Sequence, residues 1–245
     1  MGSVRTRIVE LARSVMGDER LPVVLSMTAG SADVISFLGL GGLFVAHITG
    51  NLVLLAAYLV TGTRVGLALL LSVPLFVLVL GLTRLLAASL EGVGVATLRP
   101  LLLLQFLLLA GFMGLGIAAG PHVDPNGVSA ILAGMLGVAA MAVQNALVQL
   151  SMRGTPATAV MTTNVTRFTL DVAEVLLRRD PADAAAARRR AARVWPAIVG
   201  FVAGAALGAA CYAAAGLISL ALPAGLALLA LTVSLGRVSS AAAPP

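Results

Sequence analysis

Long apolar stretches separated by short turns fill this chain between residues 21 and 236. A helix needs about 20 mainly apolar residues to cross the hydrocarbon layer of a bilayer, which is roughly 30 Å thick. A soluble core could not enclose this much apolar surface, because 60% of the residues are hydrophobic and only 11% are charged. The sequence therefore predicts an all-α integral membrane protein, a bundle of about eight hydrophobic helices. They are expected at residues 21–40, 43–62, 65–87, 101–119, 128–150, 155–177, 194–215 and 217–236.

The polar segments divide the chain into one membrane domain with a tail at each end. Residues 1–20 carry charges of both signs and precede the first apolar stretch, so we expect a cytoplasmic tail there. Residues 21–236 are expected to form a single transmembrane domain, and residues 237–245 a second tail. Inside the domain, only residues 178–193 have the length and polarity of a true loop, and six arginines lie within them.

Two membrane topologies fit the basic residues, which are sixteen arginines and no lysine. Arginine-rich connections tend to stay on the cytoplasmic side of a membrane. If all eight stretches span, twelve arginines lie on the side of the termini and three lie opposite. If residues 43–62 and 155–177 are re-entrant or surface segments instead, only Arg64 lies opposite. We expect eight spans, because 43–62 is long and apolar, and keep six spans as the alternative; both put the two termini in the cytoplasm.

A polar pattern occurs twice along the chain. Asp33 stands 18 residues before Asn51, and Asn145 stands 19 residues before Asn164. In both places a polar residue late in one helix precedes a threonine and an asparagine early in the next. Two further apolar stretches follow each pattern, which predicts two repeated units unless the similarity arose by chance. An even number of spans per unit would make the repeats parallel, and an odd number would invert them. The units would cover about residues 21–119 and 128–236.

The residues around both patterns resemble a known family. The runs AGSADVISFL at 29–38 and GLFVAHITGNL at 42–52 are similar to the motifs of the YoaK-like bacterial membrane proteins, as are QNA at 144–146 and TTN at 162–164. The resemblance extends over about residues 20–236. It implies a location in the bacterial inner membrane but no substrate, because this is a domain-of-unknown-function family. Relatives commonly carry another residue at the position of His47, so the resemblance does not make His47 essential.

Seven polar residues inside the apolar stretches are candidates for a substrate or ion pathway. Ionisable groups in hydrocarbon are costly unless they are paired or line a cavity. A polar stripe with spacings of three, four and three residues runs from 164 to 174, and Arg167 can pair with Asp171 within it. His47 and Asn51 share one helical face. The alternative is that these groups only hold helices together by hydrogen bonds. The candidates are Asp33, His47, Asn51, Asn145, Asn164, Arg167 and Asp171.

Three glycines are candidates for close helix packing. Gly200, Gly204 and Gly208 recur every four residues, and such small residues let two helix backbones approach each other in a membrane. We expect this face to pack within the chain, with a homodimer interface as the alternative. The single cysteine, Cys211, excludes a disulfide within the chain.

The motifs that mark common enzymes are missing from the sequence. There is no nucleophile elbow, no zinc-peptidase motif, no phosphate loop and no cluster of metal ligands. We therefore expect no enzyme, no metal and no cofactor. The pI of about 11.2 does not indicate nucleic-acid binding, because the arginines lie at the ends of apolar segments.

Two hypotheses of function remain. In the first, the chain is a small-solute transporter or permease with a polar site between the two repeats, in which Asp33 or Asp171 carries a coupling proton and Arg167 holds an anionic substrate group. In the second, it is a non-transporting scaffold or sensor whose polar groups only hold the helices. The expected partners are the lipid bilayer and, for the first hypothesis, a small molecule. A water-accessible cavity at the polar groups favours the first.

Overall fold

The computed structural model describes residues 2–62, 66–120, 124–152, 154–177 and 180–241, with side chains from Arg20 to Leu235 within these ranges. Five stretches are long and apolar enough to cross a bilayer, and the last of them contains two helices, so the predicted all-α membrane bundle is confirmed. The helices are α1 (Gly2–Gly39), α2 (Ile48–Thr61), α3 (Leu67–Gly92), α4 (Leu98–Ala118), α5 (Val128–Ser151), α6 (Met161–Leu177), α7 (Pro181–Ala215), the short 3-10 helix η1 (Gly216–Leu220) and α8 (Ala221–Ala241).

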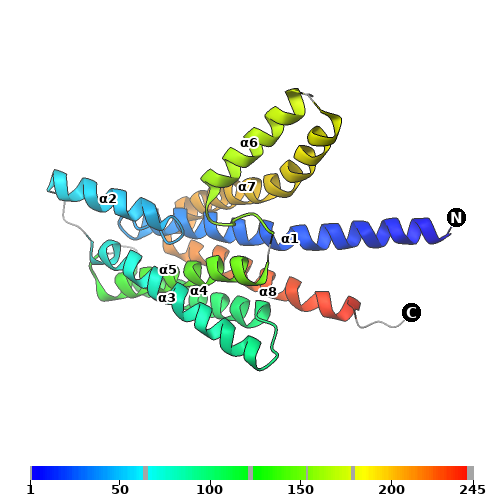
Figure 1. Ribbon diagram of the computed structural model, residues 1–245. Coiled ribbons are helices and arrows are strands. Elements are labelled where there is room, and N and C mark those ends of the chain that lie inside the picture. The colour runs from blue at the N-terminus through cyan, green and yellow to red at the C-terminus, as the bar shows by residue number, and fades with distance from the viewer. Residues whose placement is uncertain (1, 63–65, 121–123, 153, 178–179, 242–245) are drawn as a thin grey trace.

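Six long helices make up the bundle. Helices α1, α3, α4, α5, α7 and α8 run along its length, and α1 begins at the same end of the bundle at which α8 ends (Figure 1). We call this end the terminal end. Helix α1 starts at Gly2, so the helix continues through most of the segment expected to be a tail.

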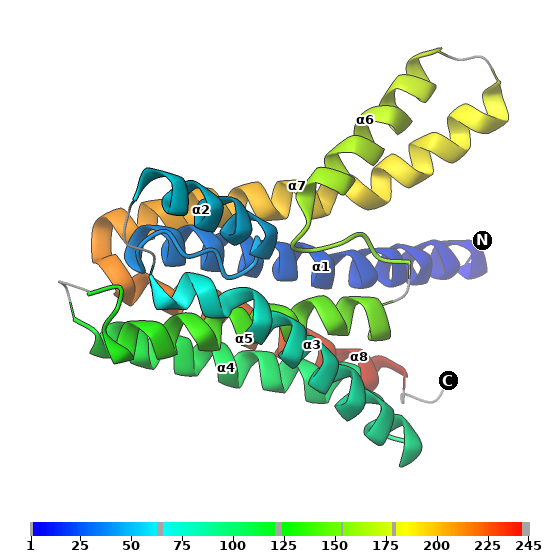
Figure 2. The same cartoon turned by 60° about the vertical axis from the view of Figure 1, so that its left-hand side comes forward.

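Helices α2 and α6 do not run the length of the bundle. At 14 residues, α2 is about 21 Å long, which is shorter than the hydrocarbon layer. After α1, residues 40–47 turn back into the bundle, and α2 then runs outward to the end of the bundle at which α1 stops. Residues 154–160 and α6 follow the same course at the terminal end, after α5 (Figures 1 and 2). The expected spans over 43–62 and 155–177 are therefore wrong, and the alternative with six spanning helices fits.

Glycines in α5 make room for the inward turn of residues 40–47. A Cβ on Gly134 would lie 2.5 Å from Leu43, and one on Gly137 would lie 2.8 Å from Val45. Leu43 and Val45 are accordingly buried against protein. Apolar side chains in this turn thus pack against a neighbouring helix, although their hydropathy alone is that of a lipid-facing helix.

The predicted polar loop at 178–193 is wrong for most of its length, because α7 begins at Pro181. The side chain of Asp180 caps the helix by accepting a hydrogen bond of 2.7 Å from the N–H of Ala182. A proline in the first helical turn and the alanine-rich sequence that follows both favour a helix. The first part of α7 and α6 form a hairpin that projects from the bundle at the terminal end (Figure 2), and Arg178 and Arg179 lie outside the described residues.

The three α7 glycines lie against the backbone of α1. A Cβ on Gly200 would stand 2.8 Å from the carbonyl oxygen of Val23, and one on Gly208 would stand 2.9 Å from the Cα of Ser31. A Cβ on Gly204 would overlap the backbone of Met27. This glycine face is therefore occupied by a helix of the same chain and is not free to form a homodimer interface.

We predict that Gly204→Leu lowers the melting temperature of the purified protein in detergent. The added side chain must push α7 away from α1, and overpacking of this kind costs about 1–3 kcal/mol or more. Gly81→Leu in α3 is the control, since nothing lies within 4 Å of a Cβ at Gly81. Equal melting temperatures for Gly204→Leu and the unmodified chain would contradict the close contact.

The six-span arrangement also predicts which connections share a side of the membrane. Cysteines are introduced singly at Val93 and Val128, which are 74% and 73% exposed, in a Cys211→Ser chain. A membrane-impermeant thiol reagent should label Val93→Cys from the side of the termini and Val128→Cys from the opposite side. Eight spans would reverse both results, so the two cysteines distinguish the arrangements directly.

Candidate functional site

Asp33 of α1 holds the inward end of α2. Its Oδ1 accepts hydrogen bonds from the backbone N–H groups of Ala46, at 2.7 Å, and His47, at 3.3 Å. Its Oδ2 lies 2.5 Å from Nδ1 of His47, the residue that caps α2. Both N–H groups lie just before the first residue of α2 and have no partner within the helix. The N-terminus of a helix carries a partial positive charge, so a buried carboxylate beside it is stabilising.

His47 connects this buried carboxylate to a groove. Its side chain is 40% exposed, whereas that of Asp33 is 4% exposed. The ring of Phe201, in α7, lies edge-on to the imidazole with the ring centroids 5.5 Å apart. With Asp33 as a carboxylate, Nδ1 carries the proton and Nε2 is the nitrogen that can accept another. The groove has a volume of about 350 Å³ and is lined by Asp33, Val34, Phe44, His47, Gly50 and Phe201.

Asn51 closes the first inward turn. Its Nδ2 donates to the carbonyl oxygen of Phe44, at 2.7 Å, and to Oγ of Ser72 in α3, at 3.0 Å. Its Oδ1 accepts a hydrogen bond from the N–H of Phe44, at 3.0 Å. The side chain is buried. Asn51 thus satisfies both backbone groups of a non-helical residue, which lipid could not do.

Asn164 closes the second inward turn in a similar way. Its Nδ2 donates to the carbonyl oxygen of Ala157, at 2.6 Å, and the side chain is buried. The partner lies seven residues earlier in the chain, as Phe44 does for Asn51. The recurring asparagines therefore mark two equivalent ties between the start of a short helix and the turn before it.

Gln144 of α5 anchors the second turn to the core. Its Nε2 donates to Oγ1 of Thr158 and to the carbonyl oxygen of Leu25 in α1, both at 2.9 Å. Its Oε1 accepts a hydrogen bond of 2.7 Å from Nε2 of Gln105 in α4. Gln144 and Thr158 are 14 residues apart, as are Asp33 and His47. Gln144, one residue before the predicted Asn145, thus holds the second turn at the same chain separation at which Asp33 holds the first.

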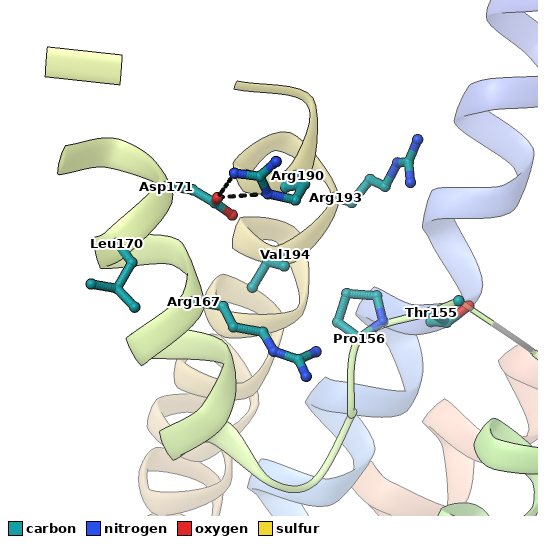
Figure 3. A pocket seen from close by; sticks show the side chains of 9 residues that line it. Thr155, Pro156, Arg167, Leu170, Asp171, Arg190, Arg193 and Val194 are labelled. Atoms are coloured by element: carbon teal, nitrogen blue, oxygen red, sulfur yellow. Dashed lines mark hydrogen bonds and ion pairs between the residues drawn. The ribbon is translucent and has the colours of Figure 1, made fainter. Parts of the chain in front are cut away.

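A second, more polar cavity opens at the terminal end between α6, α7 and the second turn (Figure 3). Asp171 does not pair with Arg167 as predicted. Its Oδ1 lies 2.6 Å from Nη2 of Arg190, in α7, and accepts a hydrogen bond of 2.8 Å from Nε of the same residue. The cavity has a volume of about 440 Å³, and its polar lining is Thr155, Arg167, Asp171, Arg190 and Arg193.

The seven predicted residues do not share one cavity. Asp33 and His47 line the groove beside α7, whereas Arg167 and Asp171 line the cavity at the terminal end. Asn51 and Asn164 are enclosed in the two turns, and half-buried Asn145 donates to the carbonyl oxygen of Met141 on its own helix. Further residues of these sites were not predicted from the sequence: Ser72, Gln105, Gln144, Thr158, Arg190, Arg193 and Phe201. For Gln144 and Thr158 the usable signal was their 14-residue spacing.

We predict that Asn51→Ala and Asn164→Ala each reduce stability. Each change leaves a carbonyl oxygen of a buried turn without its side-chain partner, which costs roughly 1–3 kcal/mol. Melting temperature in detergent and the amount of protein in the membrane should fall together. Asn145→Ala is the matched control, because Met141 keeps its carbonyl oxygen within an intact helix. If both variants melted like the control, the ties would not hold the turns.

Comparisons with known proteins give one match. No curated protein and no solved structure matches the chain. The sequence profile of the family described as "Protein of unknown function (DUF1275)" matches residues 21–233, which extend from α1 into α8. Since this match covers most of the 245 residues, the chain belongs to the DUF1275 family.

Proposed function

We propose that the chain is a small-solute permease of the bacterial inner membrane. The observation that carries the proposal is the pair of short helices, α2 and α6, that begin inside the bundle from opposite ends. Non-helical backbone at membrane depth is found where protein buries it or where it lines a watery cavity. Interrupted helices near the middle of a membrane form the binding sites of many transporters.

The two halves of the chain are, in this proposal, inverted repeats. Each half has three long helices and one short helix, and an odd number of spans turns the second unit over relative to the first. The two asparagine ties support this, as do matching helix contacts. Helix α1 packs on α7 and α8 as α5 packs on α3 and α4, and α2 packs on α3 as α6 packs on α7. Four spans per unit would have produced parallel repeats.

The arginines support cytoplasmic termini. With six spans, Arg64 is the one arginine of the sequence in a connection on the side away from the termini. Such a strong asymmetry is typical of a cytoplasmic terminal end. The cavity at Arg167 lies at the terminal end and would then open to the cytoplasm. The groove at His47 lies deeper in the bundle, where α2 begins.

The pair of Asp33 and His47 suits a coupling proton. Asp171 already forms an ion pair with Arg190, whereas His47 has a half-exposed ring beside the buried carboxylate of Asp33. Intramembrane ionisable pairs of this kind serve as proton relays in transporters. A scaffold or sensor would account equally for the enclosed asparagines. A scaffold or sensor does not require the imidazole of His47 to face a groove, and the exposed ring therefore favours the permease.

Metabolite profiling of cells that lack the gene tests the proposal. We predict that at least one small solute changes in abundance and that the unmodified chain restores it. His47→Gln should fail to restore it at equal membrane abundance, because glutamine can keep the hydrogen bond to Asp33 but cannot carry a proton. Arg84→Gln, which affects an exposed ion pair with Glu91, is the control. An unchanged metabolite profile would argue for the scaffold or sensor.

A further inference from the structure

The cavity at the terminal end has more positive than negative charge. Three guanidinium groups, those of Arg167, Arg190 and Arg193, line it together with one carboxylate, that of Asp171. Asp171 is engaged by Arg190. Neither Arg167 nor Arg193 has an ion-pair partner within the described part of the chain. Among the side chains from Arg20 to Leu235 that the structure describes, these two positive charges therefore have no counter-charge.

These two side chains come from different helices but extend to the same side. Figure 3 shows Arg167 reaching from α6 toward Pro156, and Arg193 reaching from α7 away from Asp171. Guanidinium groups present several N–H donors in a plane, a geometry that matches carboxylate and phosphate oxygens. Arg190, held by Asp171, fixes α6 against α7 and so fixes the spacing of the other two arginines.

The floor of the cavity belongs to the second inward turn. Gly154, Thr155 and Pro156 line it, and the next residues of the turn are held by Asn164 and Gln144. From Thr158 a chain of hydrogen bonds leads through Gln144 to Gln105 in the core. Oε1 of Gln105 is buried and has no hydrogen-bond partner among the described residues. The turn that forms the floor of the cavity is thus tied, two residues further along the chain, to a buried chain of hydrogen bonds in the bundle.

We propose that this cavity is a binding site for a small oxyanion, a carboxylate or a phosphate, held by Arg167 and Arg193. That the bound anion is the transported solute rests on the proposed permease function, whereas the binding itself does not. The same chemistry is offered by a free solute and by the headgroup of an anionic lipid, so the experiment must separate the two sources.

Binding is measured on the purified full-length chain in uncharged detergent. Inorganic phosphate and succinate are the soluble probes, and phosphatidylglycerol in mixed micelles is the lipid probe. Trp195 is the one tryptophan of the chain and lies in α7 two residues after Arg193, so its fluorescence reports on this helix, while the melting temperature reports on the stability of the whole chain. A soluble probe should give a saturable change in both.

Four variants test the assignment. Arg167→Gln and Arg193→Gln should each weaken the apparent affinity roughly tenfold or more, as expected for the loss of a charge-assisted hydrogen bond. Arg188→Gln removes the same charge from an α7 residue outside the cavity lining and should change the affinity less than about twofold. Asp171→Asn removes the carboxylate charge from the lining but leaves an amide oxygen that can still accept a hydrogen bond from Arg190, so it should strengthen binding even though it lowers the starting melting temperature.

The outcomes separate the two sources and the two proposals. Saturable binding of a soluble probe with this pattern of variants supports a solute site. A response to phosphatidylglycerol alone, with the same pattern, supports an oxyanion site for a lipid headgroup and removes the solute from it. No saturable response to any probe, or an equal loss in Arg188→Gln, overturns the site. Intact binding without uptake of the same anion into proteoliposomes would refute transport of the bound anion and leave the binding site standing, whereas an unchanged metabolite profile would refute the permease itself.

Discussion

The structure depends on satisfying backbone polar groups where no water is available. Within a helix these groups pair with each other, but residues 40–47 and 154–160 leave the helical path inside the bundle. Side chains take over there. Asp33 and Asn51 serve the first turn, and Gln144 and Asn164 the second. An unpaired group in hydrocarbon costs several kcal/mol, so these few side chains are the condition for having two short helices at all.

Close packing of α1 on α7 gives these turns a rigid frame. Glycines bring the two backbones into contact along one face, and Phe201 of the same helix reaches His47 at the start of α2. Helix α7 therefore packs against the core through its glycines and lines the groove through Phe201. Through Arg190 and Arg193 it also forms one wall of the cavity at the terminal end. A movement of the α6–α7 hairpin would change this cavity while the glycine contact kept the core in place.

Much of the bundle could be predicted from the sequence because the thickness of the bilayer sets the length of each span. The inward turn could not, since Leu43 and Val45 have the same hydropathy whether they meet lipid or the glycines of α5. The start of α7 was missed because its arginines suggested a loop, although Asp180 and Pro181 carry the signature of a helix start. The partner of Asp171 lies 19 residues away across a hairpin, and a local spacing rule favours a neighbour on the same helix.

The two inward turns are alike in shape and unlike in charge. The first is anchored by a carboxylate, that of Asp33, and the second by an amide, that of Gln144. Each anchor stands 14 residues before its partner, which is His47 for Asp33 and Thr158 for Gln144. An amide does not titrate in the range in which a carboxylate or an imidazole does. Of these two anchors, the one in the first half is therefore the one that can change its charge. If a proton is bound at an anchor, it is bound once per chain and not twice, although both halves contain an inward turn.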